Sequence, residues 1–214
     1  MMKLYGYRNG RTQRVAWTLE EVGAEYEYVE VDLMCGEGQE PWFLAINPAG
    51  KVPVLIDGGQ VITESAAICM HLADKYPSSR LLPPVGSPER TECYKWISFI
   101  VTEIDAPLWT IAKHRFALPK ERRVPSVIDT AMWEFDIAVR ILETGLHRRP
   151  FLTSDTLTVA DILAGHTLSW AKSARFELSS DLERYLDSLL TRRAAKRASE
   201  RISALPGVSI ALDG

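Results

Sequence analysis

The stretch Asn47–Ser65, NPAGKVPVLIDGGQVITES, decides the fold of this chain. Two short apolar runs, Val52–Ile56 and Gln60–Ile62, flank Asp57-Gly58-Gly59, which is typical of the tight turn of a β-hairpin. A predicted helix follows directly, from Ser65 to Lys75. The stretch therefore predicts two antiparallel strands followed by a helix.

The residues before this stretch predict alternating strands and helices. Val15, Leu19 and Val22 recur at helical spacing, and Gly23 then stops the helix. The predicted elements are a strand over Lys3–Tyr7, a helix over Thr12–Val22, a strand over Tyr26–Val31 and a short helix over Pro41–Ile46. With the hairpin and its helix, they give the order βαβαββα, a small mixed sheet with helices on it.

The segment Pro77–Pro88 separates two parts of the chain. It holds four prolines and a glycine in twelve residues, which neither a helix nor a central strand tolerates. Helical patterns follow it over Glu89–Phe116 (interrupted at Pro107), Pro125–His147, Thr158–Ser173, Ser179–Thr191 and Arg192–Ala204. We therefore expect an α/β domain over residues 1–76, a linker over 77–88 and an all-α helical domain over 89–214.

Two features of the helical part have structural explanations. Thr158 and Asp161 are spaced as a capping box, with Leu157 and Ile162 at the hydrophobic staple positions. The basic stretch after Thr191 predicts a solvated helix face, because a charge run in an acidic chain is usually exposed. That stretch contains Arg192, Arg193, Lys196, Arg197 and Arg201.

Composition and charge exclude several classes of protein. The chain has 214 residues, of which 46% are hydrophobic and 25% charged, the usage of an ordinary globular protein. Its 25 Lys and Arg against 28 Asp and Glu give a formal net charge of -3, so a nucleic-acid partner is not expected. No run approaches the roughly 20 apolar residues of a membrane span, so a membrane association is not expected either.

The cysteines and histidines predict neither a disulfide framework nor a metal site. Cys35, Cys69 and Cys93 are odd in number and have no CxxC spacing. The four histidines have no metal-ligand spacing on a shared helix face. Free thiols are typical of a reducing compartment, so we expect a cytoplasmic protein without a metal.

The first candidate site is the dipeptide Val52-Pro53. A cis peptide bond there would leave the Val52 N–H and C=O free to pair with an extended peptide. The alternative is that Pro53 only ends a loop. The residues alone do not separate the two interpretations.

The second and third candidate sites are helix N-termini. At Thr63-Glu64-Ser65, free N–H groups and the Ser65 hydroxyl attract a carboxylate, while Glu64 can pair with an amine. The alternative is that Ser65 is simply an N-cap. The loop Tyr5–Arg14 places polar donors where a thiolate would be stabilised by the helix dipole. The alternative interpretation of this loop is a polar turn capped at Asn9 or Thr12.

Trp109 and Phe116 are candidates to line an apolar pocket at the domain interface.

Taken together, these stretches resemble the cytosolic glutathione transferase family over nearly the whole chain. Asn47–Leu55 is similar to the family's cis-proline motif, and Thr63-Glu64-Ser65 to its γ-glutamyl-binding motif. Leu157–Asp161 is similar to its helix-capping signature, and Gln13–Glu21 to the first helix of bacterial members. The resemblance implies a thioredoxin-like N-terminal domain and an all-helical C-terminal domain.

The resemblance also implies a function and a set of contacts. Glutathione would be the cosubstrate, and its thiolate would attack a small hydrophobic electrophile in a detoxification reaction. Val52, with Pro53 beside it, would pair with the cysteinyl unit, and Glu64 with Ser65 would hold the γ-glutamyl end. Lys51 would lie near the glycyl carboxylate, Thr12 would add a contact at the first helix, and the chain would be a homodimer.

The sequence departs from the family at the catalytic position. Serine-type relatives place a serine near the start of the first helix, where this chain has Gly10. We favour Asn9, with Arg11 in support, as the group that stabilises the thiolate. In a second register Tyr5 takes that role. Two other functions remain open: a glutathione-dependent reductase or dehalogenase, and a module that binds glutathione or another ligand without turnover.

Overall fold

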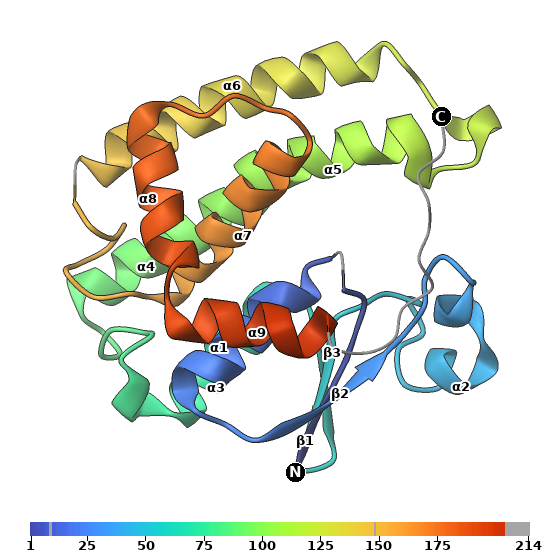
Figure 1. Cartoon of the computed structure of the whole chain (residues 1–214), viewed down its shortest axis with the longest axis horizontal. Coiled ribbons are helices and arrows are strands. Elements are labelled where there is room, and N and C mark those ends of the chain that lie inside the picture. Colours follow the sequence, from blue (N-terminus) through green and yellow to red (C-terminus); the bar gives the residue numbers. More distant parts are fainter. Residues whose placement is uncertain (9, 148, 204–214) are drawn as a thin grey trace. The chain divides into compact units, whose positions relative to one another are not determined.

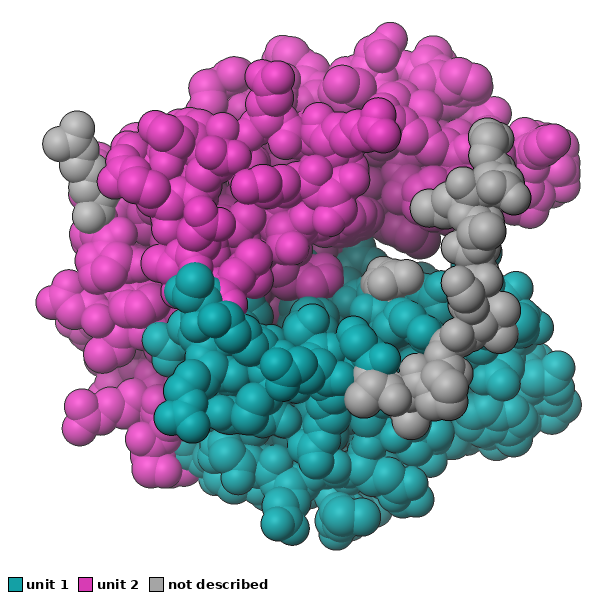
Figure 2. Space-filling model, in the orientation of Figure 1, with its two compact units in different colours: residues 1–76, 191–214 teal, residues 77–190 magenta. Residues whose placement is uncertain are grey.

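The computed structural model describes residues 1–8, 10–147 and 149–203 (Figure 1). The chain divides into two compact units (Figure 2). Unit 1 contains residues 1–76 and the described residues from 191 on, and unit 2 contains residues 77–190. The expected helical domain began at residue 89 and included everything after it, whereas residues 191–203 belong to unit 1.

Unit 1 is built on a four-stranded mixed sheet with the strand order β2-β1-β3-β4. Its strands are β1 (Met2–Gly6), β2 (Tyr26–Glu30), β3 (Val54–Asp57) and β4 (Gln60–Thr63). β1 is parallel to β2 and antiparallel to β3, and β3 is antiparallel to β4. Met2, Leu4 and Gly6 are buried while Lys3 and Tyr5 are half-buried, the alternation that a sheet with one more deeply buried face requires.

The helices of unit 1 confirm the predicted order βαβαββα. They are α1 (Thr12–Val22), the single turn α2 (Pro41–Leu44), α3 (Ser65–Lys75) and α9 (Arg193–Ser203). α1 ends at Gly23, which adopts the left-handed conformation at φ 68° that glycine accommodates without strain. α1 and α3 pack against each other.

Helix α9 packs along α1 (Figure 1), which explains why the end of the described chain belongs to unit 1. Three arginines of the basic stretch form ion pairs with α1. Arg192 Nε lies 2.7 Å from Glu21, Arg197 Nε lies 2.8 Å from Glu20, and Arg201 Nη1 lies 3.2 Å from Glu20. These three side chains keep 36%, 47% and 46% of their surface exposed, in line with the predicted solvated face, and the sequence did not predict their pairing with the two glutamates of α1. Ala204, the predicted end of this helix, lies outside the described residues.

Unit 2 is helical, as predicted. Its elements are α4 (Pro88–Phe99), a π-helical segment (Ile100–Asp105), α5 (Ala106–Ala112), a second π-helical segment (Lys113–Ala117), α6 (Val127–Leu146), α7 (Val159–Ser173) and α8 (Ser180–Leu190). Short 3₁₀ turns occur at Glu37–Gln39 in unit 1 and at Pro77–Ser79 and Lys120–Arg122 in unit 2. Pro107 does not end the long first helix. The wider π turns come just before it, where a proline without an N–H would disrupt regular α-helical bonding.

The capping box at α7 is confirmed. The Asp161 carboxylate accepts the Thr158 N–H at 2.8 Å, and it also accepts the Leu152 N–H at 2.8 Å and the Tyr185 hydroxyl at 2.7 Å. Leu157 and Ile162, at the staple positions, are buried. Leu81, within the expected linker, accepts the Val159 N–H at 2.8 Å, so that segment is tied to the start of α7.

Candidate functional site

One row of residues across the sheet brings the three candidate sites of unit 1 to one edge. Tyr5 on β1 stands opposite Val54 on β3, and Val54 stands opposite Thr63 on β4. From this row, β1 leads out into the β1–α1 loop, the chain before β3 leads back to Val52, and the chain after β4 leads to Ser65. Because neighbouring strands lie about 4.8 Å apart, these three segments leave the sheet side by side.

The loop before β3 is braced by its own side chains and ends in a cis peptide bond at Val52-Pro53. The buried Asn47 side chain donates to the Lys51 carbonyl at 2.7 Å and accepts the Ala49 N–H at 3.1 Å. Among the described residues, the Val52 backbone groups and the Lys51 ammonium have no hydrogen-bond partner. The loop therefore presents an unpaired peptide unit and an exposed cation at the sheet edge.

A neighbouring turn lies so close to this loop that it needs two glycines. A Cβ on Gly38 would lie 2.7 Å from the Gly50 carbonyl oxygen, and Gly50 itself has φ 64°. The 3₁₀ turn at Glu37–Gln39 thus covers the loop from the side and fixes its path. This close approach could not be predicted from the sequence, because it depends on how the turn and the loop pack together.

The start of α3 is the second element of the site. Glu64 occupies the N-cap position with φ 65° and ψ 110°, a region that costs a non-glycine residue about 1–3 kcal/mol. No side chain caps this helix, and the exposed Glu64 carboxylate has no partner among the described residues. Ser65 is 5% exposed and is the first helical residue rather than the N-cap. The alternative interpretation, in which Ser65 is simply the N-cap of α3, is therefore wrong.

Arg14 is a residue of this site that the sequence did not single out. It is 1% exposed, within α1, and its Nη1 donates to the Ser65 Oγ at 3.3 Å. A buried guanidinium thus lies against the first residue of α3 and adds positive charge to the positive end of that helix. Nothing in the spacing of α1 distinguishes Arg14 from a solvated arginine.

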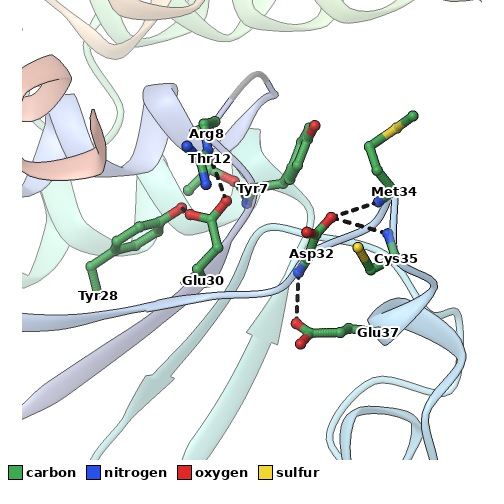
Figure 3. A network of polar contacts seen from close by, with 9 residues as sticks. All are labelled: Tyr7, Arg8, Thr12, Tyr28, Glu30, Asp32, Met34, Cys35 and Glu37. Carbon is green, nitrogen blue, oxygen red and sulfur yellow. Dashed lines mark hydrogen bonds and ion pairs between the residues drawn. The ribbon is translucent and has the colours of Figure 1, made fainter. Parts of the chain in front are cut away.

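The start of the β1–α1 loop is hydrogen-bonded to Thr12 at the beginning of α1 (Figure 3). The Thr12 Oγ1 accepts the Tyr7 N–H at 3.0 Å, and the side chain is fully buried. Gly6 makes this possible, since a Cβ there would lie 2.1 Å from the Thr12 Cγ2. The buried Thr12 side chain therefore fixes the position of Tyr7 at the start of the loop. Arg11 is half-buried just before α1, and Asn9 lies outside the described residues.

Tyr5 belongs to an aromatic cluster on the same edge. Its ring centroid lies 6.4 Å from that of Trp42 and 6.3 Å from that of Phe43. Tyr5 and Val52 both pack against a buried core that includes Phe43 and Val54. The structure thus brings Tyr5 and Val52 together, with the ring of Tyr5 held by packing.

Trp109 and Phe116, the candidates for an apolar pocket, both lie in unit 2. Trp109 is half-buried in α5, and Phe116 is 69% exposed in the second π-helical segment. An exposed phenylalanine and a half-buried tryptophan offer apolar surface to a ligand.

None of the three thiols is activated as a nucleophile. Burial raises the pKa of Cys69 to about 11 and also raises the pKa of Cys93. A hydrogen bond with the Asp32 carboxylate raises the pKa of the exposed Cys35. All three cysteines are free. Within the described ranges there is no group of three His, Cys, Asp or Glu side chains that could hold a metal ion.

Comparison with known proteins supports one family throughout. The family model "Glutathione S-transferase, N-terminal domain" matches residues 1–74. A zeta-class glutathione S-transferase of Euphorbia esula is 36% identical over 165 residues, covering 75% of this chain and 72% of that protein.

In the described part of the chain, no helix has the length and apolarity to cross a membrane.

Solved structures show the same relationship over nearly the whole chain. A glutathione transferase from Methylococcus capsulatus superimposes with a TM-score of 0.84 at 30% identity, covering 96% of this chain and all of that one. A glutathione transferase homologue from Lodderomyces elongisporus, solved with two glutathione molecules per subunit, gives a TM-score of 0.83 at 26% identity, covering 94% and 98%. The chain belongs to the glutathione S-transferase family.

Proposed function

We propose that this protein conjugates glutathione to small hydrophobic electrophiles. The thiolate sulfur forms a bond to the electrophilic carbon, the leaving group departs with the electron pair of the broken bond, and the thiol proton goes to solvent. The observation that carries the proposal is the row Tyr5–Val54–Thr63, from which the β1–α1 loop, the unpaired Val52 peptide unit and the uncapped start of α3 leave one edge of the sheet.

The start of α3 is suited to the γ-glutamyl end of glutathione. Its uncapped N–H groups favour a carboxylate, and the Glu64 carboxylate favours the ammonium group. Because Arg14 donates to the Ser65 oxygen, the Ser65 hydroxyl hydrogen is left to donate to an anion. Both charges of an α-amino acid therefore find a complementary group within two residues.

The loop before β3 is suited to the rest of the tripeptide. The Val52 N–H and C=O can pair with the cysteinyl unit as one added strand residue, with Pro53 fixing the direction of the chain. Lys51 is exposed beside it and supplies a cation for the glycyl carboxylate. This is the contact set that the family resemblance implies, and the unpaired Val52 groups support it.

The β1–α1 loop is suited to the thiolate. A free thiol has a pKa of about 8.5 and is mostly protonated at neutral pH, so a donor must favour the anion. We propose Asn9 for this role with Arg11 in support, in the serine-type register in which Gly10 replaces the serine. The packing of Tyr5 against Trp42 and Phe43 supports the same choice, because it gives that ring a structural role. Trp109 and Phe116 would contact the apolar part of the electrophile.

The two rival functions differ in what supports them. A reductase or dehalogenase that used a protein thiol is disfavoured, because burial or a neighbouring carboxylate raises the pKa of each cysteine. A module that binds glutathione without turnover is favoured by one feature, the absence of a side chain at Gly10.

We further propose a cytoplasmic, homodimeric protein that takes part in detoxification. The free thiols fit a reducing compartment. A two-fold dimer is the commonest closed assembly. Sedimentation at micromolar concentration tests the dimer directly.

Turnover of a chloro-nitroaromatic with glutathione tests the proposed activity. Conjugation that depends on glutathione is expected, with retention of the protein on glutathione resin. Retention without turnover would support the binding module instead. Neither retention nor turnover would contradict both.

A further inference from the structure

Glu30 joins the end of β2 to the β1–α1 loop through two hydrogen bonds. Its Oε1 accepts from the Arg8 Nε at 3.2 Å, and its Oε2 accepts from the Tyr28 hydroxyl at 2.5 Å (Figure 3). Glu30 stands opposite Gly6 in the parallel pairing of β1 and β2, at the point where β1 ends and the loop begins. Arg8 therefore reaches back from the loop to the strand beside it.

This ion pair is shielded in a way that a surface pair on the same strands is not. Side-chain exposure is 29% for Arg8 and 18% for Glu30, whereas Lys3 and Glu27, which pair at 3.0 Å, are 45% and 41% exposed. Exposed pairs contribute little because water screens them. The more buried pair, with its second hydrogen bond, constrains its partners more strongly.

Tyr28 keeps the Glu30 carboxylate in place. Burial, with the neighbouring Glu30 carboxylate, raises the pKa of Tyr28 well above its usual value, so the phenol stays protonated and donates. Tyr28 and Glu30 are two apart on β2 and so project on the same face of the sheet. Their hydrogen bond leaves the other carboxylate oxygen directed to Arg8.

The backbone of the loop is hydrogen-bonded at the two residues before Arg8. The Val31 N–H donates to the Gly6 carbonyl at 2.7 Å, and the Tyr7 N–H donates to Thr12 at 3.0 Å. These bonds fix the two residues before Arg8. The Glu30 contact adds a side-chain bond that ties the next residue of the loop, Arg8, to β2.

On the basis of the proposed function, we propose that Glu30, supported by Tyr28, is a positioning residue for the thiolate site. It acts through Arg8 on the path of the β1–α1 loop and so on the donors that face the sulfur. Neither Glu30 nor Tyr28 touches glutathione in this proposal. Their effect is on the pKa of the bound thiol and not on the binding of the tripeptide.

The test compares Glu30→Gln with Glu27→Gln, a matched loss of one charge on the same strand. For Glu30→Gln, the pKa of bound glutathione should rise by about one unit, and kcat/KM at neutral pH should fall about tenfold, since the thiolate fraction falls about tenfold per unit. The glutathione Kd should change by less than about threefold. Glu27→Gln should change none of these, and Tyr28→Phe should give a smaller shift in the same direction.

A double variant shows whether Glu30 acts through Arg8. If it does, Glu30→Gln combined with Arg8→Gln should be no worse than Arg8→Gln alone. Additive losses would overturn the route through Arg8. A lower Tm with an unchanged thiol pKa in Glu30→Gln would overturn the positioning role while leaving the proposed function intact. A parent protein that binds glutathione without lowering its thiol pKa would overturn both.

Discussion

Arg14 in α1 donates from Nη1 to the hydroxyl of Ser65, the first residue of α3, at 3.3 Å. The two residues are 51 positions apart in the chain, and both side chains are buried. Their contact places a guanidinium directly behind the helix terminus to which we assign the γ-glutamyl end of glutathione. Several properties of the protein should depend on this arrangement.

Changing Arg14 should weaken glutathione binding more than it weakens turnover. Hydrogen bonds to charged groups contribute about 1.5–3 kcal/mol, so Arg14→Gln should raise the glutathione Kd by about tenfold or more, measured by calorimetry. Arg14→Lys, which keeps the charge, should lose less. Arg193→Gln, an exposed arginine of α9, is the control. An unchanged Kd in a folded Arg14→Gln protein would remove Arg14 from the site.

Glu64 should be the anchor of the γ-glutamyl amine. Glu64→Ala removes the exposed carboxylate, and the glutathione Kd should rise by about tenfold or more. Ser65→Ala should cost less, because the N–H groups of α3 remain. Glu25→Ala, an exposed glutamate just after α1, serves as the control and should bind glutathione as the parent does. If Glu64→Ala binds glutathione as tightly as the parent, the assignment of this motif is wrong.

Gly6 should not tolerate a side chain. In Gly6→Ala the new Cβ would lie 2.1 Å from the Thr12 Cγ2, and overpacking of this kind costs about 1–3 kcal/mol. The loss should appear as a lower denaturant midpoint, and Thr12→Ser in the same chain should recover part of it by removing the Cγ2. Gly10→Ala is the matched control, since among the described residues a Cβ there would meet only the Tyr7 carbonyl oxygen, at an ordinary contact distance of 3.5 Å. Equal stability of the two alanine variants would contradict the packing described here.

Asp57 should contribute to stability only above acidic pH. A hydrogen bond from Lys75, and then one from His71, hold the pKa of Asp57 below its usual value. A carboxyl whose pKa is lower in the folded chain stabilises the fold above its unfolded pKa of about 3.9, and this contribution is lost as the pH falls through the folded pKa. The Tm of the parent should exceed that of Asp57→Asn near neutral pH, and the two should converge in acid. A difference that stays constant with pH would argue against the ion pair.

The parts of the fold that local chemistry specifies were predictable from the sequence. Asp57-Gly58-Gly59 forms the turn between β3 and β4, Gly23 ends α1, and Thr158 with Asp161 starts α7. Each signal depends on residues within a few positions of one another. The candidate site motifs at Val52 and Glu64 are local patterns too, and their roles in binding stay predictions.

The remainder depends on contacts between distant residues. The burial of Arg14 follows from the position of α3, and the pairing of Arg192 with Glu21 follows from the packing of α9 on α1. Neither partner is visible in the local pattern, so charged residues with structural roles looked like solvated ones. The π-helical turns before Pro107 were likewise not predictable, because a proline in a helical pattern is equally consistent with a helix end.

The identity of the thiolate donor is tested by two variants. In the favoured register Asn9→Ala should raise the pKa of bound glutathione and lower turnover at neutral pH, with little change in the glutathione Kd, because the donor favours the reactive anion. Tyr5→Phe should then have a small effect. In the second register the two results are exchanged, so the pair of variants decides between them.

The central claim is that this chain binds glutathione and lowers the pKa of its thiol for attack on an electrophile. The most direct measurement is the thiolate absorbance of the parent protein's glutathione complex, titrated against pH. We predict a midpoint well below the value of about 8.5 for a free thiol, with conjugation rates that follow the same titration. A complex whose thiol titrates as it does in free solution would contradict the account and would leave a glutathione-binding module as the function of this fold.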